Sequence, residues 1–190
     1  MSGLRTFEVA PGRILEVVQG DITLIAADVI VNAANSALAG GGGVDGAIHR
    51  IGGPAIMADL ERRYGPDRHC PTGGAVISAA GILPATWVVH AVGPIWRGGG
   101  SGEAELLASA YRTAIELAEA AGARSITFPA ISCGIYGYPL PAGAAAGLTT
   151  VGEGLRAARA IEHAAFVLFS NDTFEVFARA LSLLDPDAPR

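Results

Sequence analysis

The chain has 190 residues, of which 51% are hydrophobic and 16% charged, a composition typical of a globular protein with a proper core and not of a disordered chain. Its net charge is −5 and it contains no lysine, which disfavours a broad basic surface for nucleic acid and excludes a P-loop, since that motif needs lysine. No apolar run is long enough to cross a bilayer, and the N-terminus lacks the apolar core of a signal peptide, so we expect a cytoplasmic protein with no membrane partner.

Short β-branched runs alternate along the chain with segments rich in Ala and Leu at helical spacing. The predicted strands cover residues 6–9, 15–18, 29–32, 75–78, 87–91, 125–129 and 165–170. The predicted helices cover residues 46–51, 54–64, 103–121, 142–159 and 173–184. The central strands read as continuous apolar runs, as expected for a sheet that is covered on both faces. The predicted fold is therefore α/β, a three-layer α/β/α sandwich with a central mixed sheet.

The predicted elements show neither an internal repeat nor a linker between domains. We expect a single domain over residues 1–184 and a frayed tail over 185–190, where two prolines occur. The glycine-rich stretch 97–102 is predicted to be a flexible loop. The two cysteines, Cys70 and Cys133, form no framework of closely spaced pairs, so we expect reduced thiols.

The most informative stretch follows the predicted strand at 29–32. Two amides, Asn32 and Asn35, stand at its end, and the four glycines Gly40–Gly43 then lead to Asp45. Glycines let backbone N–H groups approach a ligand that side chains would block. Ligands of open α/β sheets collect at loops beyond the strand C-termini. The stretch predicts a pocket for a phosphorylated sugar with one candidate general base beside it.

A second glycine-rich loop, Ser132–Pro139, follows the strand at 125–129 and precedes a helix. A strand, glycine loop and helix in this order can aim several N–H groups at one anion. Two such loops could enclose a diphosphate without a basic side chain. The alternative is that the glycines only serve tight turns, but two loops at neighbouring strand ends favour the binding site.

Several stretches taken together resemble one family. They are Gly20–Thr23, Val31–Ser36, Gly40–His49, His90–Pro94 and Pro129–Pro139. In this order they strongly resemble a macrodomain, and within that family the MacroD-type hydrolases, over roughly residues 15–181. The resemblance implies a cleft for ADP-ribose on an α/β/α sandwich. It also implies release of ADP-ribose from esters with protein carboxylates, or deacetylation of O-acetyl-ADP-ribose.

The resemblance gives roles to residues at the adenine end. Asp21 would accept a hydrogen bond from the adenine 6-amino group, although Gly-Asp-x-Thr also fits a helix N-cap or an Asx-turn. Ile22 would offer its backbone N–H to the ring. Phe169 would stack on adenine, although core packing is the more common role for a Phe in an apolar run.

At the other end the resemblance assigns the phosphates and the distal ribose. Asn35 would bind hydroxyls of that ribose, Tyr136 would cover it with its ring, and Asn32 would brace the loop through backbone hydrogen bonds. The diphosphate would be clasped from two sides by the residues Gly41, Gly42, Gly43 and Val44 and by Ser132, Cys133, Gly134, Ile135 and Tyr136.

Asp45 and Asn35 are the predicted catalytic residues. By its chemistry alone Asp45 could cap the helix predicted from residue 46, where an acid is favoured. In the family pattern it is also one of the residues that bind ADP-ribose, near the distal ribose and a water, which it would orient or deprotonate. Alternatively, the substrate's own phosphate activates the water. His49, four residues on, would orient Asp45 or bond to the framework, and His90 would anchor its loop.

Cys133 could suggest a thiol hydrolase, but no base is evident nearby and we expect direct attack by water. We expect no metal site, because the adjacent His69 and Cys70 have no second pair at finger-like spacing. No cofactor is needed.

The leading hypothesis is therefore a hydrolase of mono-ADP-ribosyl esters and of O-acetyl-ADP-ribose, with ADP-ribose and ADP-ribosylated proteins as its partners. The alternative is a reader module that binds ADP-ribose without catalysis. An RNA-binding module is disfavoured by the acidic charge.

Overall fold

The computed structural model describes residues 3–184. Its strands are β1 (Leu4–Ala10), β2 (Arg13–Gln19), β3 (Val29–Ala33), β4 (Ala75–Ala79), β5 (Trp87–Ala91), β6 (Ser125–Phe128) and β7 (His163–Leu168). Its helices are η1 (Ile22–Leu24), α1 (Gly43–Gly52), α2 (Pro54–Tyr64), α3 (Glu103–Ala120), α4 (Leu140–Ala157) and α5 (Asn171–Ser182).

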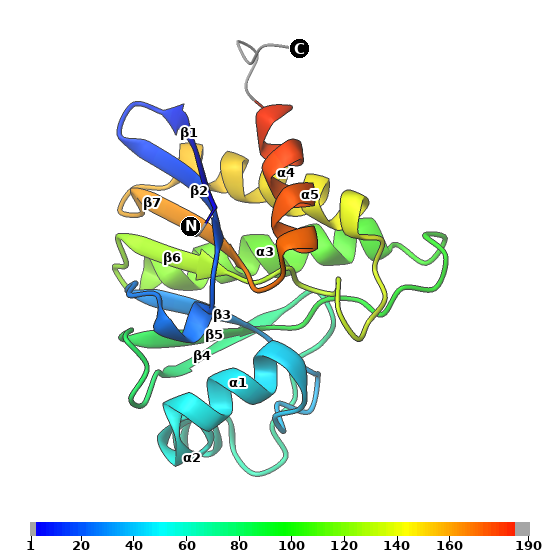
Figure 1. The fold of residues 1–190 in the computed structure, drawn as a ribbon. Coiled ribbons are helices and arrows are strands. Elements are labelled where there is room, and N and C mark those ends of the chain that lie inside the picture. The colour runs from blue at the N-terminus through cyan, green and yellow to red at the C-terminus, as the bar shows by residue number, and fades with distance from the viewer. Residues whose placement is uncertain (1–2, 185–190) are drawn as a thin grey trace.

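Within the described chain the strands form one mixed sheet in the order β1-β2-β7-β6-β3-β5-β4. The pairs from β2 to β5 are parallel, and the two edge strands β1 and β4 pair antiparallel. Helices α1 and α2 lie on one side of the sheet and α3, α4 and α5 on the other (Figure 1). The predicted three-layer sandwich with a mixed sheet is confirmed.

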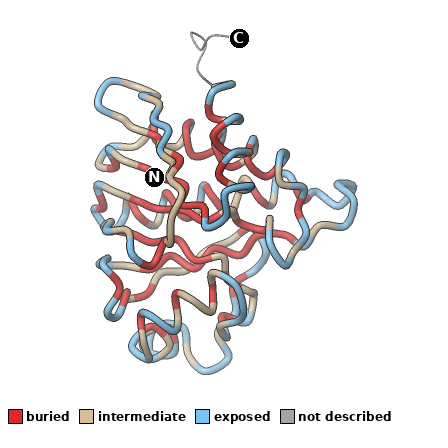
Figure 2. The backbone as a smooth tube through the Cα atoms, in the orientation of Figure 1, coloured by how far each residue is buried: buried red, intermediate tan, exposed pale blue. Residues whose placement is uncertain are grey.

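Each face of the sheet carries its own apolar core. On β3, Val29 and Val31 belong to the core under α3, α4 and α5, while Ile30 belongs to the core under α1 and α2. Successive side chains of a strand point to opposite faces, so both faces need apolar residues. This is why apolar and polar residues do not alternate along the central strands, and why these strands are buried along most of the sheet's centre (Figure 2).

Two element boundaries differ from the prediction in ways that matter for function. Helix α1 begins at Gly43, three residues before the predicted start, so Asp45 lies inside its first turn. Strand β7 ends at Leu168, so Phe169 stands beyond the sheet. Gly43 has a φ of +59°, which glycine adopts without strain. Apolar spacing cannot predict a helix start that is set by the backbone conformation of a glycine.

The loop at 97–102 is tied down and not free. The Glu103 carboxylate accepts hydrogen bonds from the backbone N–H groups of Arg97, Gly99 and Ser101 at 3.0, 3.2 and 2.6 Å. The backbone N–H of Glu103 itself, followed by these three bonds, lowers the pKa of Glu103, and the three bonds hold the loop at the start of α3. The predicted tail at 185–190 lies outside the described residues. None of the helices described in residues 3–184 has the length and apolar character that a membrane span requires.

Candidate functional site

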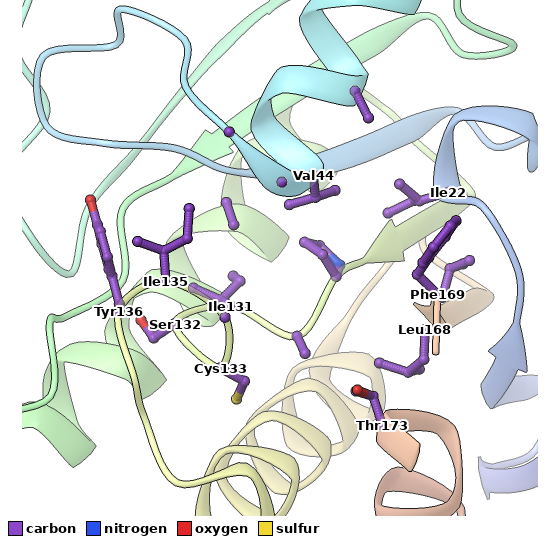
Figure 3. A pocket seen from close by; sticks show the side chains of 18 of the residues that line it. Ile22, Val44, Ile131, Ser132, Cys133, Ile135, Tyr136, Leu168, Phe169 and Thr173 are labelled. Carbon is purple, nitrogen blue, oxygen red and sulfur yellow. The ribbon is translucent and has the colours of Figure 1, made fainter. Parts of the chain in front are cut away.

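A cavity of about 770 Å³ opens where the loops after β3, β6 and β7 meet, a size usual for a small-molecule site. Figure 3 shows Tyr136 and Phe169 at its opposite ends. Its lining includes every predicted binding residue except Asp45, namely Asp21, Ile22, Asn35, Gly41, Gly42, Gly43, Val44, Ser132, Cys133, Gly134, Ile135, Tyr136 and Phe169. The structure therefore brings together segments that are far apart in the sequence.

The two glycine-rich loops approach each other at the cavity. A Cβ built on Gly42 would lie 3.6 Å from Ile135 Cδ1. Gly42 is the N-cap of α1 and supplies no side-chain cap, so the first N–H groups of the helix stay available. Within the described chain the N–H groups of Gly134, Ile135 and Tyr136 donate no hydrogen bond either. Main-chain donors thus lie on both sides of the cavity.

Ser132 is strained and buried in the second loop. Its φ is +65°, a left-handed conformation that is unfavourable for a residue with a Cβ. Its hydroxyl is buried and has no hydrogen-bond partner among the described residues. A Cβ at Gly93 would overlap the Ser132 oxygen, so the glycine after β5 lets this loop come close to the sheet.

Asn35 holds its own loop together. Its Nδ2 donates to the Gly40 carbonyl at 2.8 Å and its Oδ1 accepts from the Ala39 N–H at 3.4 Å. A Cβ built on Gly41 would lie 3.8 Å from Asn35 Nδ2 and 3.0 Å from Asp45 Oδ2. The two predicted catalytic side chains therefore meet at Gly41, which lines the cavity.

The Asp45 carboxylate lies in the wall of the cavity and not in its lining. It is only 5% exposed. Its Oδ1 accepts from Asn32 Nδ2 at 2.7 Å and lies 3.3 Å from His49 Nε2. The prediction that Asn32 acts through backbone bonds is wrong, because its side chain holds Asp45. The alternative that Asp45 caps the helix is also wrong, because Gly42 is the N-cap of α1. Of the two roles predicted for His49, the structure shows the contact with Asp45.

Behind Asn32 the network continues to two residues that the sequence analysis did not connect with it. His90 Nδ1 lies 3.1 Å from Asn32 Nδ2, and His90 Nε2 lies 2.9 Å from the Ser78 hydroxyl. The prediction that His90 anchors its loop did not include these contacts with Asn32 and Ser78. Asn32 and His90 are register partners on the parallel strands β3 and β5, each one residue before the strand's end, and no local pattern in the sequence gives this register.

At the end of the cavity where adenine is predicted to bind, Asp21 has the N-cap role that the sequence offered as its alternative. It is the N-cap of η1, and its Oδ1 accepts from Thr23 N at 2.9 Å and Thr23 Oγ1 at 2.7 Å. Phe169 is 82% exposed, so core packing is wrong for this ring.

Arg50, which sequence reasoning missed, is the one cationic residue in the described lining. It follows Val44 and Ala47 at helical spacing on α1.

Comparisons with known proteins agree on one family. A family model described as Macro domain matches residues 31–146. The O-acetyl-ADP-ribose deacetylase of Cronobacter sakazakii is 51% identical over 174 residues, which is 92% of this chain and 96% of that protein. This chain belongs to the macrodomain family.

Solved macrodomains share its structure. An Oceanobacillus iheyensis macrodomain with ADP has a TM-score of 0.90 and 37% identity, with 97% of each chain covered. A Trypanosoma brucei macrodomain in complex with ADP-ribose has a TM-score of 0.78 and 35% identity, over 88% of this chain and 68% of that one.

In this macrodomain Cys133 is poorly suited to act as a nucleophile. Burial raises the pKa of its thiol to about 11, so little thiolate forms near neutral pH. Its sulfur is turned toward α4 (Figure 3), where a Cβ at Gly143 would overlap it. Both cysteines are free thiols. The described residues hold no cluster of three potential metal ligands.

Proposed function

We propose that this macrodomain hydrolyses esters of ADP-ribose. Its substrates would be O-acetyl-ADP-ribose and proteins that carry mono-ADP-ribose on acidic side chains. The observation that carries the proposal is the meeting of two sets of free main-chain donors with Asn35 and Asp45 at one cavity. The deacetylase name of a relative that is 51% identical supports the first substrate.

Binding would run along the cavity from Phe169 to Tyr136. The exposed Phe169 ring offers a face for adenine, and the backbone N–H of Ile22 would donate to it. Asp21 engages Thr23 through Oδ1, which leaves Oδ2 for the adenine amino group. The diphosphate would lie between Gly42 and Ile135, where the uncapped start of α1 favours an anion. Each bond from such an N–H to a charged oxygen contributes about 1.5–3 kcal/mol.

The chemistry would take place beside Gly41. Asn35 would orient the distal ribose, and Asp45 Oδ2, which is nearest to Gly41, would orient or deprotonate a water. Attack of that water on the acetyl carbonyl breaks the ester C–O bond and yields acetate and ADP-ribose, with one proton released. For a glutamyl ester, attack on the carbonyl or on the anomeric carbon yields glutamate and ADP-ribose. The alternative, activation of the water by a substrate phosphate, would leave Asp45 a positioning role.

Hydrolysis of two substrates tests the proposal. The protein is incubated with O-acetyl-ADP-ribose and with a protein bearing glutamate-linked mono-ADP-ribose, and the released ADP-ribose is measured. We expect release from both, and a loss of turnover of about 10²–10⁴-fold in Asp45→Ala, as is typical of a lost general base or positioning group. Asn35→Ala is compared beside it.

Calorimetry with ADP-ribose supplies the control. The parent and Asp45→Ala should both bind, because Asp45 does not line the cavity. Binding without release from either substrate would contradict the hydrolase and favour a reader module. Release from the acetyl ester alone would restrict the proposal to deacetylation.

A further inference from the structure

A line of three buried side chains lies behind Asp45. Asn32 of β3, His90 of β5 and Ser78 of β4 come from three neighbouring strands, and all are 0% exposed. They are not among the described residues that line the cavity. Their link to the site is the bond from Asn32 to the Asp45 carboxylate.

The hydrogen bonds of this line run in one direction. The Ser78 hydroxyl donates to the Ala79 carbonyl at 3.1 Å, so its oxygen is left to accept from His90 Nε2 at 2.9 Å. A neutral imidazole has one N–H and one bare nitrogen. His90 therefore carries its hydrogen on Nε2 and presents Nδ1 as an acceptor.

This tautomer fixes the amide of Asn32. Its Nδ2 donates one hydrogen to His90 Nδ1 at 3.1 Å and the other to Asp45 Oδ1 at 2.7 Å. The flipped amide would set its oxygen against the Asp45 carboxylate, two acceptors face to face. In the observed orientation Asn32 Oδ1 has no partner among the described residues, a cost that the two bonds of Nδ2 offset.

The surroundings keep His90 neutral. Burial lowers its pKa to about 3, repulsion from His49 acts in the same direction, and attraction to Asp45 opposes both. The rings of His49 and His90 lie 5.7 Å apart. A protonated His90 would place a hydrogen on Nδ1 and could no longer accept from Asn32.

We infer that His90 is a positioning residue of the ester hydrolase. With Ser78 it locks the Asn32 amide so that Asn32 holds Asp45 by Oδ1 and leaves Oδ2 beside Gly41 and Asn35. This inference rests on the proposed function. His90 is buried on β5 and cannot touch the substrate, but it would still affect turnover.

Two substitutions at His90 separate positioning from packing. His90→Phe fills the space but offers no acceptor, so kcat should fall about 10- to 100-fold, the usual cost of a displaced catalytic group, while the Kd for ADP-ribose stays unchanged. His90→Asn places an amide oxygen close to the position of Nδ1 and should recover most of kcat, although the smaller side chain leaves a cavity and lowers stability. kcat should therefore be higher in His90→Asn than in His90→Phe, although both substitutions lower stability.

Thr127→Val is the matched control. Thr127 is a buried polar residue of β6 whose hydroxyl has no partner among the described residues, and kcat should not change. Wild-type kcat in folded His90→Phe, or no advantage of His90→Asn over it, would overturn the inference.

Nitrogen NMR of the histidine ring gives a readout that does not depend on activity. At pH 5, His90 should show a protonated Nε2 and a bare Nδ1, and Ser78→Ala should weaken this preference. A protonated Nδ1 in the parent would contradict the inference. If the parent instead releases no ADP-ribose from either ester, the proposed function fails while the NMR result still decides the orientation of Asn32.

Discussion

The two walls of the cavity are supported by different kinds of contact. The first wall, Gly41–Asp45 at the start of α1, is backed by a polar line in which Asn32 holds Asp45 and His90 holds Asn32. The second wall, Ser132–Tyr136, is held by main-chain hydrogen bonds, such as Trp96 N–H to the Tyr136 carbonyl at 2.9 Å, and its side chains are backed by apolar contacts. Cys133 packs against Gly143, and Tyr138 meets Trp96 edge to face with ring centroids 4.8 Å apart.

This difference separates two tasks. A polar backing fixes the orientation of one carboxylate, because hydrogen bonds are directional. An apolar backing fixes the position of a loop whose main-chain amides we propose bind the diphosphate. We therefore expect changes behind the first wall to alter turnover, and changes behind the second wall or at the adenine end to alter affinity.

The largest effect on affinity is expected at the adenine end. Phe169→Ala removes an exposed ring from the cavity, and stacking of a base on such a ring contributes about 1–3 kcal/mol. The Kd for ADP-ribose should rise accordingly while kcat at saturating substrate is unchanged, as measured by calorimetry and by release assays. Phe169→Tyr, which keeps a ring face, should bind like the parent. A fall in kcat would break the separation of tasks.

A substitution behind the second wall tests the apolar backing. A Cβ at Gly143 would overlap the Cys133 sulfur, and overpacking costs about 1–3 kcal/mol, against a helix propensity gain of about 1 kcal/mol for alanine over glycine. Gly143→Ala should therefore lower stability in urea unfolding and weaken ADP-ribose binding.

The sign should reverse when the sulfur is removed. In a Cys133→Ala background, Gly143→Ala should stabilise the protein by up to about 1 kcal/mol, since only the propensity gain remains. Equal effects in both backgrounds would contradict the contact.

Acid should weaken the first wall through His90. Its pKa is about 3 in the folded protein against 6.5 for an unperturbed histidine, so between these values the unfolded chain binds more protons. Stability should then fall as pH drops from 6.5 toward 4.5, by at most about 1.4 kcal/mol per unit for this group. Asp59, whose pKa is lowered to about 2, acts mainly below this window, whereas Glu103 and Glu119, whose pKa values are lowered from 4.5, also contribute at its lower end in both proteins. Urea unfolding of His90→Phe should show a shallower decline than the parent, and an equal decline would exclude His90 as its source.

The smallest effect is expected at Cys133. Its raised pKa and its sulfur turned toward α4 leave it without a role in hydrolysis. Cys133→Ser should retain the parent's kcat. Complete loss of turnover in a variant that still folds and binds ADP-ribose would restore the thiol as a candidate nucleophile.

Much of the cavity could be predicted because its signals are local. Glycines beside Asn35 and Asp45 mark the first loop, and a second glycine loop after another apolar run marks its counterpart. Phe169 was harder to place, because an apolar run does not reveal where a strand stops and a ring becomes exposed. Arg50 could not be linked to the site from the sequence, because only the turns of α1 bring it to the cavity that the glycine loop lines.

The sequence by itself determined the layered α/β fold and the two glycine-rich loops that line the cavity, since apolar periodicity and glycine placement are properties of short segments. Only the tertiary structure decided that Asp45 lies in the wall and is held through Asn32 by His90. That arrangement depends on the register of β3 against β5 and on the start of α1 at a left-handed glycine, which are set by packing between residues far apart in the chain.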